Sequence, residues 1–514
     1  MLTLLASIAL AQTPPETFDG RIHQELAAGH ITDHEALWLS YLQVFEPTAL
    51  PETYREERYG WLCGTGVVQQ LKLHWSEFNA QERARITGVL TPWQADLGQD
   101  SVDRPAGPPA DSTCWAQEGA NALKSEHFQV EWDSGVTQTQ ADSFARALEV
   151  AYTKQLADGW RQPEGMNNYL MQISITNQNY AGAYTTVALC GNFWMPYIVA
   201  GRGSFQVGPW YQSMAAHEFN HASQYAYGDG MQFWFWEATA SYVQESVVPA
   251  LNDWVDPIAQ GYADKPWMSM QASSQQDQDQ FWHMYGMAVW MFYLDEHVGG
   301  PQLVRDMWAW SEDKPGQYDL WQDDALADLG YDFQTTYDGF IVNNTVMDFA
   351  EQAAFPHVAL TDTVSAYPAN GAVSGNGAPQ SRGQNYIKLA TSSTANEDLP
   401  DLQVQFDGDL AGQWTAWLVG TSAGKVVDQV HFDLIDGSGS ARLEGMDDFD
   451  DAWIVVSPMV ADETPTAHYG YTWSAARVER ERHGLAAACG CQSSPTQSGW
   501  LLLLPALLWR RRRA

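Results

Sequence analysis

Apolar and polar residues follow three successive patterns along the chain, and the first is helical. HQELAAGHITDHEALWLSYLQVF (23–45) and WSEFNAQERARITGVL (75–90) carry apolar residues at helical spacing, the second after a Ser-x-x-Asn start typical of a helix cap. They predict a helical N-terminal region over residues 12–115, whose end at 100–114 is a linker rich in Pro, Asp, Ser and Gly. Two interpretations of this region stay open: a propeptide that shields an active site until cleavage, and a structural helical subdomain.

The second pattern begins near residue 125 and mixes strands with helices. EHFQVEW (126–132) and YLMQISIT (169–176) alternate as strands do, residues 137–160 have a strongly periodic helical pattern, and 180–205 is rich in β-forming residues. Further helical patterns follow at residues 210–227, from about 235, at 278–298 and at 301–312. This order predicts an α+β domain, which we place at residues 116–352.

The third pattern begins near residue 355, where helical periodicity ends. Short alternating runs lie at regular spacing between Gly, Asp and Ser turns: YIKLAT, LQVQF, TAWLVG, QVHFDLI, AWIVVS and YGYTWSA. Such runs predict an antiparallel β-sandwich over residues 353–480. The fold class predicted for the whole chain is therefore α+β, with a helical N-terminal region, a mixed central domain and a C-terminal sandwich.

Composition supports several packed domains and excludes one class of partner. The 514 residues are 45% apolar and 17% charged, as expected for a globular protein of more than one domain. The 63 acidic and 26 basic residues give a formal charge of −37. That balance argues against nucleic acid as a partner, because binding to phosphates needs clustered Lys and Arg.

Both ends of the chain predict processing rather than fold. An apolar run closed by Ala9-Leu10-Ala11 predicts a signal peptide at residues 1–11. Near the other end, Cys489-Gly490-Cys491 precedes a polar spacer, an apolar run and four arginines. The apolar run would form a helix of about 15 Å, half the thickness of a bilayer core, so contact with the membrane is expected to be transient. This order resembles the Cys-Gly-Cys sorting tails of secreted myxobacterial proteins, which implies that residues 481–514 are a processing signal for display on the outer cell surface.

Three cysteines remain outside the tail. In an oxidising compartment, Cys63 and Cys114 are expected to form a disulfide, because they flank one N-terminal segment. This pairing leaves Cys190 unpaired.

The stretch that carries chemistry is WYQSMAAHEFNHASQYAYG, whose pattern predicts a helix over residues 210–227. His217 and His221 are one helical turn apart and therefore project side by side. Two imidazoles so placed can occupy adjacent corners of a tetrahedral zinc site, and Glu218 can accept a proton from the water that zinc activates. The alternative is a solvated helix face with two titrating histidines.

The third ligand distinguishes the subclasses of such sites. A three-histidine site, H-E-x-x-H-x-x-G-x-x-H, needs Gly at 224 and His at 227, and the chain has Gln224 and Tyr227, so this class is excluded. Glu237, in WFWEATASY, follows a Gly-Asp-Gly turn and is the predicted third ligand. Glu245, two helical turns further on, is the second choice. The alternative for Glu237 is an acid that merely suits the positive end of a helix dipole.

HEFNH followed by WFWEATASY resembles the gluzincin type of zinc metalloprotease, in particular secreted metalloproteases of myxobacteria. The resemblance implies a zincin-like catalytic domain at 116–352, Zn²⁺ as cofactor and a protein or peptide as substrate. It also implies His217, His221 and Glu237 as zinc ligands and Glu218 as the general base.

The chain departs from this family at one position. Gluzincins place an Asp four residues after the ligand Glu, where it orients the first histidine through a hydrogen bond. Here that position holds Ser241, whose hydroxyl carries no charge. The departure puts metal affinity and activity in more doubt than the ligand geometry.

Three weaker features complete the predicted site. Tyr285, in FWHMYGMAVWMFYL, is either a donor to the oxyanion of a tetrahedral intermediate or, like His283, an ordinary residue of a helix packed on the site. The segment 180–205 can supply an edge strand that pairs with an extended peptide. The acidic run DDFDD (447–451) lacks a calcium-loop pattern and reads as a solvated turn.

Taken together, the sequence predicts a secreted or surface-displayed zinc-dependent endopeptidase. A non-catalytic cell-surface binding protein with a structural or vestigial metal site is the alternative. An open coordination position beside Glu218 distinguishes the two, since structural zinc sites are closed by four protein ligands.

Overall fold

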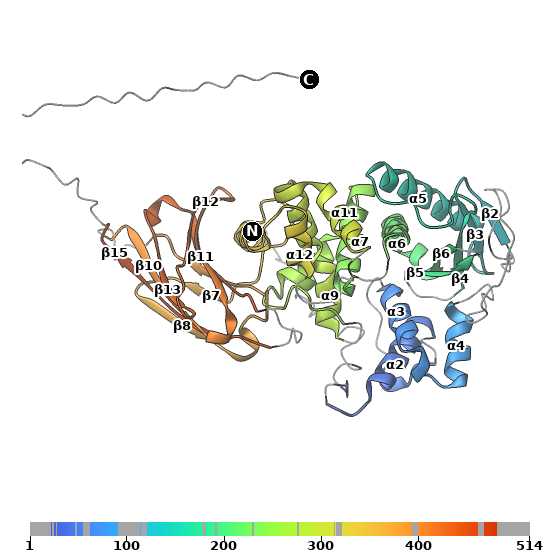
Figure 1. Ribbon diagram of the computed structural model, residues 1–514, viewed down its shortest axis with the longest axis horizontal. Helices are drawn as coiled ribbons and strands as arrows, with labels where there is room; N and C mark the ends of the chain where they lie inside the picture. The colour runs from blue at the N-terminus through green and yellow to red at the C-terminus, as the bar shows by residue number, and fades with distance from the viewer. Residues whose placement is uncertain are drawn as a thin grey trace, which may run out of the picture.

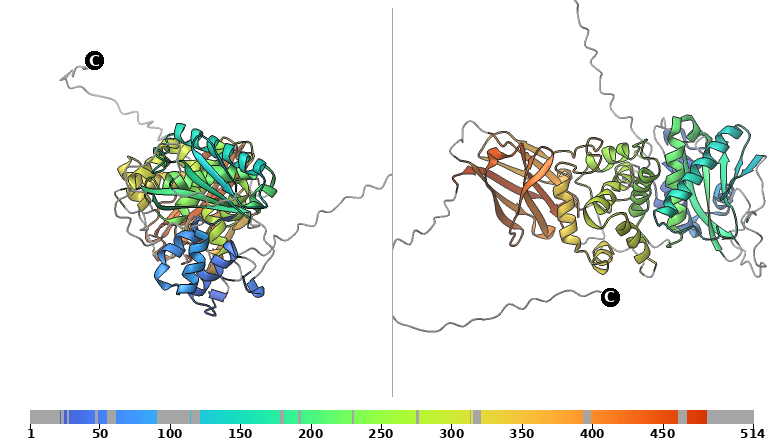
Figure 2. Two further views of the ribbon diagram at one scale, coloured as in Figure 1. Left: turned by 90° about the vertical axis from the view of Figure 1, so that its right-hand side faces the viewer. Right: turned by 90° about the horizontal axis from the view of Figure 1, so that it is seen from above.

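The computed structural model confirms an α+β fold that ends in a β-sandwich. It describes residues 28–46, 49–54, 62–90, 121–177, 181–190, 193–228, 231–274, 277–312, 321–392, 399–460 and 467–480, together with Ile22, Glu25, Leu26, Cys114 and Lys314. The predicted signal peptide and sorting tail lie outside these residues. Figures 1 and 2 show the sandwich, a layer of helices and a mixed sheet in a row, with the N-terminal helices beside the sheet.

The N-terminal region is helical, as predicted, and it also adds a strand to the sheet. Its helices are α2 (Asp33–Phe45), α3 (Thr65–Leu73) and α4 (Ala80–Leu90), with single turns at Glu52–Tyr54 and Trp75–Glu77. Helix α2 begins with a capping box, in which Thr32 and Glu35 each accept a hydrogen bond from the other's backbone N–H. The short strand β1 (Leu62–Cys63), which the sequence pattern did not predict, pairs in parallel with Gly182 and Ala183.

The central sheet has six strands in the order β1-β5-β6-β4-β3-β2. The other strands are β2 (Asn121–Lys124), β3 (Phe128–Trp132), β4 (Met171–Thr176), β5 (Gly182–Cys190) and β6 (Phe193–Gly201). Strands β5 and β6 are antiparallel, as are β2 and β3, whereas β3, β4 and β6 run parallel. The order places β1 outside β5, so the prediction of a free edge strand in 180–205 is wrong at Gly182–Ala183.

Helices α5 (Gln138–Ala157) and α6 (Tyr211–Gln224) pack on each other and on this sheet. Phe219 of α6 meets Phe128 of β3 edge to face, with ring centroids 5.9 Å apart. The Gln155 side chain of α5 donates to the carbonyl of Ala216 at 2.7 Å. Two short turns, Arg202–Gln206 and Gly208–Trp210, lead into α6. This packing fixes the depth and rotation of the helix that carries the two histidines.

A layer of helices follows: α7 (Phe233–Val247), α8 (Val255–Pro257), α9 (Gln278–Gly286), α10 (Ala288–Tyr293), α11 (Pro301–Trp310), α12 (Trp321–Asp328) and α13 (Phe333–Asn343), with π-helical turns at Ile258–Ala263 and Leu294–Gly299. Many of the tryptophans lie in its core, among them Trp234, Trp236, Trp308 and Trp321. Gly261 lets two of these elements touch, because a Cβ there would lie 2.1 Å from the carbonyl oxygen of Trp282. The chain has 24 tryptophans, and those in this layer serve core packing.

The C-terminal part is a sandwich of a four-stranded and a five-stranded sheet, in the orders β13-β10-β15-β8 and β12-β11-β14-β9-β7. Its strands are β7 (Asp362–Val364), β8 (Ala369–Val373), β9 (Asn385–Leu389), β10 (Asp401–Gly408), β11 (Trp414–Ser422), β12 (Lys425–His431), β13 (Ser438–Leu443), β14 (Asp451–Pro458) and β15 (Tyr471–Val478), with single turns at Gly375–Gly377, Leu410–Gly412 and Met446–Asp448. All described pairs are antiparallel except β7 with β9. In the acidic run, Asp447 pairs with Arg477 and Asp451 with Lys388, so these carboxylates serve structural ion pairs.

The disulfide differs from the predicted one. Cys114 is bonded to Cys190, with their Cα atoms 5.8 Å apart. Cys63 lies opposite Ala183, seven residues before Cys190 on β5, which corresponds to about 23 Å along a strand. The prediction of a Cys63–Cys114 bridge is therefore wrong, because Cys114 lies at the other end of β5. A disulfide is typical of an oxidising compartment.

The described helices differ from a membrane-spanning helix in length, hydropathy or both. None of them is both long and apolar enough to cross a bilayer.

Candidate metal centre

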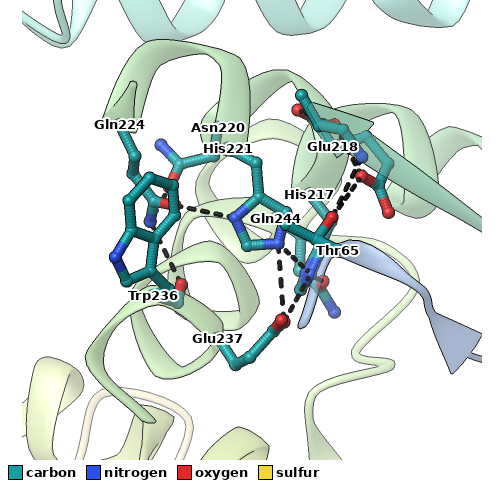
Figure 3. Close-up of polar contacts among 10 residues, drawn as sticks. Thr65, His217, Glu218, Asn220, His221, Gln224, Trp236, Glu237 and Gln244 are labelled. Atoms are coloured by element: carbon teal, nitrogen blue, oxygen red, sulfur yellow. Dashed lines mark hydrogen bonds and ion pairs between the residues drawn. The ribbon is translucent and has the colours of Figure 1, made fainter. Parts of the chain in front are cut away.

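Two neighbouring helices bring the three predicted ligands together. His217 and His221 lie one turn apart on α6, and Glu237 faces them from α7 (Figure 3). Both helices are buried along these faces, and the exposed fractions are 7% for His217 and 0% for His221 and Glu237. Within the described part of the chain, this is the one group of three or more His, Cys, Asp and Glu side chains arranged closely enough to hold a metal ion.

The distances between the facing atoms suit a tetrahedral ion. Nε2 of His217 lies 3.1 Å from Nε2 of His221 and 3.1 Å from Oε2 of Glu237, and Nε2 of His221 lies 3.4 Å from the same oxygen. Ligand atoms bound to zinc at about 2.0–2.1 Å in a tetrahedron are about 3.3 Å apart. The three side chains can therefore take three corners of such a site without rearrangement.

The carboxylate of Glu237 also has one oxygen that a cation could bind. Its Oε1 is buried and has no hydrogen-bond partner among the described residues, although a buried carboxylate oxygen without a partner is costly. Burial would raise the pKa of Glu237, but the charge of His221 and the hydrogen bond from His217 outweigh it and hold the pKa at about 2. Burial likewise acts to lower the pKa of His221, yet the charge of Glu237 leaves that pKa raised above 6.5. The site thus holds an anionic carboxylate in a buried setting, which favours a cation.

Each imidazole is oriented by a glutamine. Oε1 of Gln244 lies 3.1 Å from Nδ1 of His217, and Oε1 of Gln224 lies 2.7 Å from Nδ1 of His221. An amide oxygen only accepts, so each Nδ1 carries a proton, and each Nε2 is the nitrogen that can give up its proton to bind a metal. Gluzincins have an Asp at the position of Ser241, but the residue that faces Nδ1 of His217 here is Gln244, one turn further along α7.

The orientation of the Gln224 amide follows from its other contacts. Its Nε2 donates to Oδ1 of Asn220 at 2.9 Å and to the carbonyl of Trp236 at 3.1 Å, which leaves its oxygen for His221. Asn220 in turn donates to Gln155 of α5 at 3.2 Å. The His221 ring is therefore tied to both neighbouring helices through a chain of buried amides.

Glu218 lies beside the three ligands but outside their group. Its exposed fraction is 1%, and its Oε2 accepts a 2.7 Å hydrogen bond from the hydroxyl of Thr185 on β5. Figure 3 shows the carboxylate turned toward Thr65 and away from the Glu237 carboxylate. The predicted base thus faces the sheet side of the site.

Of the remaining predicted residues, Tyr285 contacts a ligand, whereas Glu245 and His283 do not belong to the ligand group. Tyr285 packs on His217, with ring centroids 6.0 Å apart and planes 24° from parallel. Glu245 lies outside the ligand group, and burial raises its pKa to about 8. His283 is fully buried, which lowers its pKa to about 4 and marks it as a neutral core histidine.

Sequence reasoning missed four residues that contact the site: Gln224, Gln244, Thr185 and Thr65. Gln224 had a findable signal, because it lies three residues after His221 and i, i+3 neighbours meet on a helix. Gln244 lies one helical turn after Ser241, the position where an Asp was expected. It could have been found as the next hydrogen-bonding side chain on the same face of the helix. Thr65 had no local signal, because its contact with Glu218 spans 153 residues.

Comparison with known proteins finds no family model that matches the chain and no matching curated protein.

Proposed function

We propose that this protein is a secreted or surface-displayed zinc-dependent endopeptidase. The observation that carries the proposal is the buried group of His217, His221 and Glu237, whose facing atoms lie 3.1–3.4 Å apart with Glu218 next in sequence to the first histidine. Catalytic zinc sites have three protein ligands and an open position, and three is the number found within the described residues. The disulfide supports an extracellular setting.

Zinc is the ion we propose because two imidazoles and one carboxylate at tetrahedral spacing are a donor set that it prefers. Bound zinc supplies a Lewis acid that polarises a carbonyl and acidifies a water molecule. Gln224 and Gln244 keep the two imidazoles in the tautomer that leaves Nε2 available.

Glu218 would transfer the proton of the attacking water to the leaving amine. A carboxylate that accepts a proton from the attacking water can return it to the leaving amine, so one residue serves both steps. The phenol of Tyr285, whose ring lies against His217, would donate to the oxygen that becomes negative in the transition state. A protein or peptide in extended conformation is the substrate class that this chemistry implies.

The near-complete burial of the site favours a second candidate function. His217, with an exposed fraction of 7%, is the most accessible of the three ligands. A buried metal can simply stabilise a fold, and the protein would then be a non-catalytic surface binding protein with a structural ion.

Hydrolysis of an unfolded protein by the wild type and by Glu218→Gln separates these functions. The peptidase proposal expects cleavage by the wild type, and loss of cleavage with full zinc content in the variant, since Glu218 is not a ligand. A zinc-loaded wild type that cleaves none of a broad set of unfolded proteins would support the structural-metal alternative instead.

A further inference from the structure

We infer that Thr185 and Thr65 form a two-hydroxyl clamp that positions the carboxylate of Glu218, so that the N-terminal region contributes a working part of the site. The positioning role rests on the proposed peptidase function. The clamp itself is a set of contacts that can be tested without that function.

Thr185 holds Glu218 at two points. Its Oγ1 lies 2.7 Å from Oε2 of Glu218 and 2.9 Å from the backbone carbonyl oxygen of the same residue. A hydroxyl has a single proton, and the charged carboxylate oxygen is both the closer and the stronger acceptor. The proton of Thr185 therefore goes to the side chain of the predicted base, which is held against β5.

Thr65 completes the clamp from another part of the chain. Its Oγ1 accepts a 2.9 Å hydrogen bond from the backbone N–H of Thr185 and lies 3.5 Å from Oε2 of Glu218. Because the oxygen of Thr65 is used as an acceptor, its proton is left to point at the carboxylate. Thr65, Thr185 and Glu218 are all buried, with exposed fractions of 0%, 0% and 1%, so water does not compete strongly for these contacts.

The position of Thr65 follows from the strand that precedes it. The N–H of Gly64 donates to the carbonyl of Ala183 at 2.7 Å, which extends the β1–β5 pairing up to Thr65. A side chain at residue 64 would meet Tyr184, since a Cβ there would lie 3.3 Å from the Cβ of Tyr184. Thr65 is the first residue of α3, and this pairing places its hydroxyl between β5 and the carboxylate of Glu218.

The same region shares a hydrophobic core with the sheet and α6. Phe45 of α2 meets Tyr184 of β5 edge to face, with centroids 5.2 Å apart, and both belong to one cluster with Phe219 of α6. Removal of the N-terminal helices would expose this cluster and withdraw one of the two hydroxyls. We therefore infer that these helices remain with the site in the working protein.

Valine substitutions test the clamp because they keep the shape of threonine and remove the hydroxyl. Thr185→Val and Thr65→Val are compared with Thr185→Ser, which keeps a hydroxyl. The matched control is Thr186→Val, the next residue of β5, whose side chain points to the opposite face of the sheet. Each variant is assayed as the full zinc-loaded chain for bound zinc, kcat, KM and the denaturant midpoint of unfolding.

The clamp predicts that Thr185→Val keeps its zinc and its KM but loses about 10- to 100-fold in kcat, as expected when a catalytic group is misplaced by about 1 Å. Thr65→Val should show a smaller loss, and Thr185→Ser should restore most of the rate. Neither valine variant should reduce the residual rate further in a Glu218→Gln background. Wild-type kcat in both valine variants, with the wild type active, would overturn the positioning role.

The unfolding midpoint tests the contact independently of hydrolysis. Thr185→Val should lower the midpoint in the wild type and change it far less in a Glu218→Ala background, where its partner is absent. Equal shifts in both backgrounds would show that the hydroxyl does not hold Glu218. An inactive wild type with a clear coupling in this cycle would overturn the proposed function while leaving the clamp in place.

Discussion

Oε1 of Gln244 lies 3.1 Å from Nδ1 of His217, so a neutral amide stands where gluzincin-type sites use a carboxylate to orient the first histidine. An amide fixes the direction of the ring as a carboxylate does, but it withdraws no proton and adds no negative charge. The imidazole is correspondingly a weaker electron donor to a bound cation. Gln244 itself therefore contributes ligand geometry rather than charge to the site.

Removal of this amide should weaken metal binding. Gln244→Leu keeps much of the side-chain volume but leaves Nδ1 of His217 without its acceptor, and we expect a loss of about 10-fold or more in zinc affinity. Competition with a chromogenic chelator measures the effect. The matched control is Ser241→Ala, which should bind zinc as the wild type does. A large loss in Ser241→Ala with none in Gln244→Leu would show that the orienting residue is misassigned.

Zinc affinity should rise with pH through the titration of His221. The charge of Glu237 keeps the pKa of His221 raised despite burial, so the metal-free site keeps its imidazolium proton to a higher pH than a free histidine would. Zinc needs the neutral imidazole, and binding must release that proton, so affinity increases with pH until His221 is deprotonated and then levels off. Chelator competition between about pH 5 and 9 follows this curve. A flat curve over that range would contradict the pairing of His221 with Glu237.

Glu245→Gln should stabilise the fold and leave zinc binding unchanged. Burial raises the pKa of Glu245 from 4.5 to about 8, so the folded state holds a proton that the unfolded state has released. Between these values the folded state binds more protons, and stability falls as pH rises. The amide removes this loss of stability. We expect a gain of about 1–2 kcal/mol near pH 8, after allowance for the partial exposure of Glu245, and none near pH 4. Urea unfolding at both pH values measures it, and an equal effect at both would contradict the assignment.

Separation of the N-terminal helices should lower activity rather than release it. A specific protease site placed ahead of Cys114, within the linker predicted at residues 100–114, cuts the chain so that the disulfide stays with the sheet. The fragment that carries Thr65 can then be removed in mild denaturant. The shared core and the clamp predict loss of kcat and of stability in the remaining part. A rise in activity after removal would instead support the propeptide interpretation of residues 12–115.

The elements with strong local patterns were predictable from the sequence. The helix of His217 and His221 and the sandwich strands follow from periodicity alone, and Glu237 follows from the turn between two helices. The juxtapositions that depend on distant pairing were not predictable in this way. Strand β1 has only two residues, and Cys114 reaches Cys190 across 76 positions, so neither has a signal in nearby residues. Thr65 belongs to the same class, because its role depends on the pairing of β1 with β5.

The number of zinc ions bound per chain tests the central claim most directly. Wild type, Glu237→Gln and Glu245→Gln are loaded with zinc, desalted and analysed for metal by mass spectrometry. The account predicts one zinc per chain in the wild type and in Glu245→Gln, and little or none in Glu237→Gln, because Glu237 and not Glu245 lies with His217 and His221. A wild type that retains no zinc, or a Glu237→Gln variant that retains as much as the wild type, would contradict it.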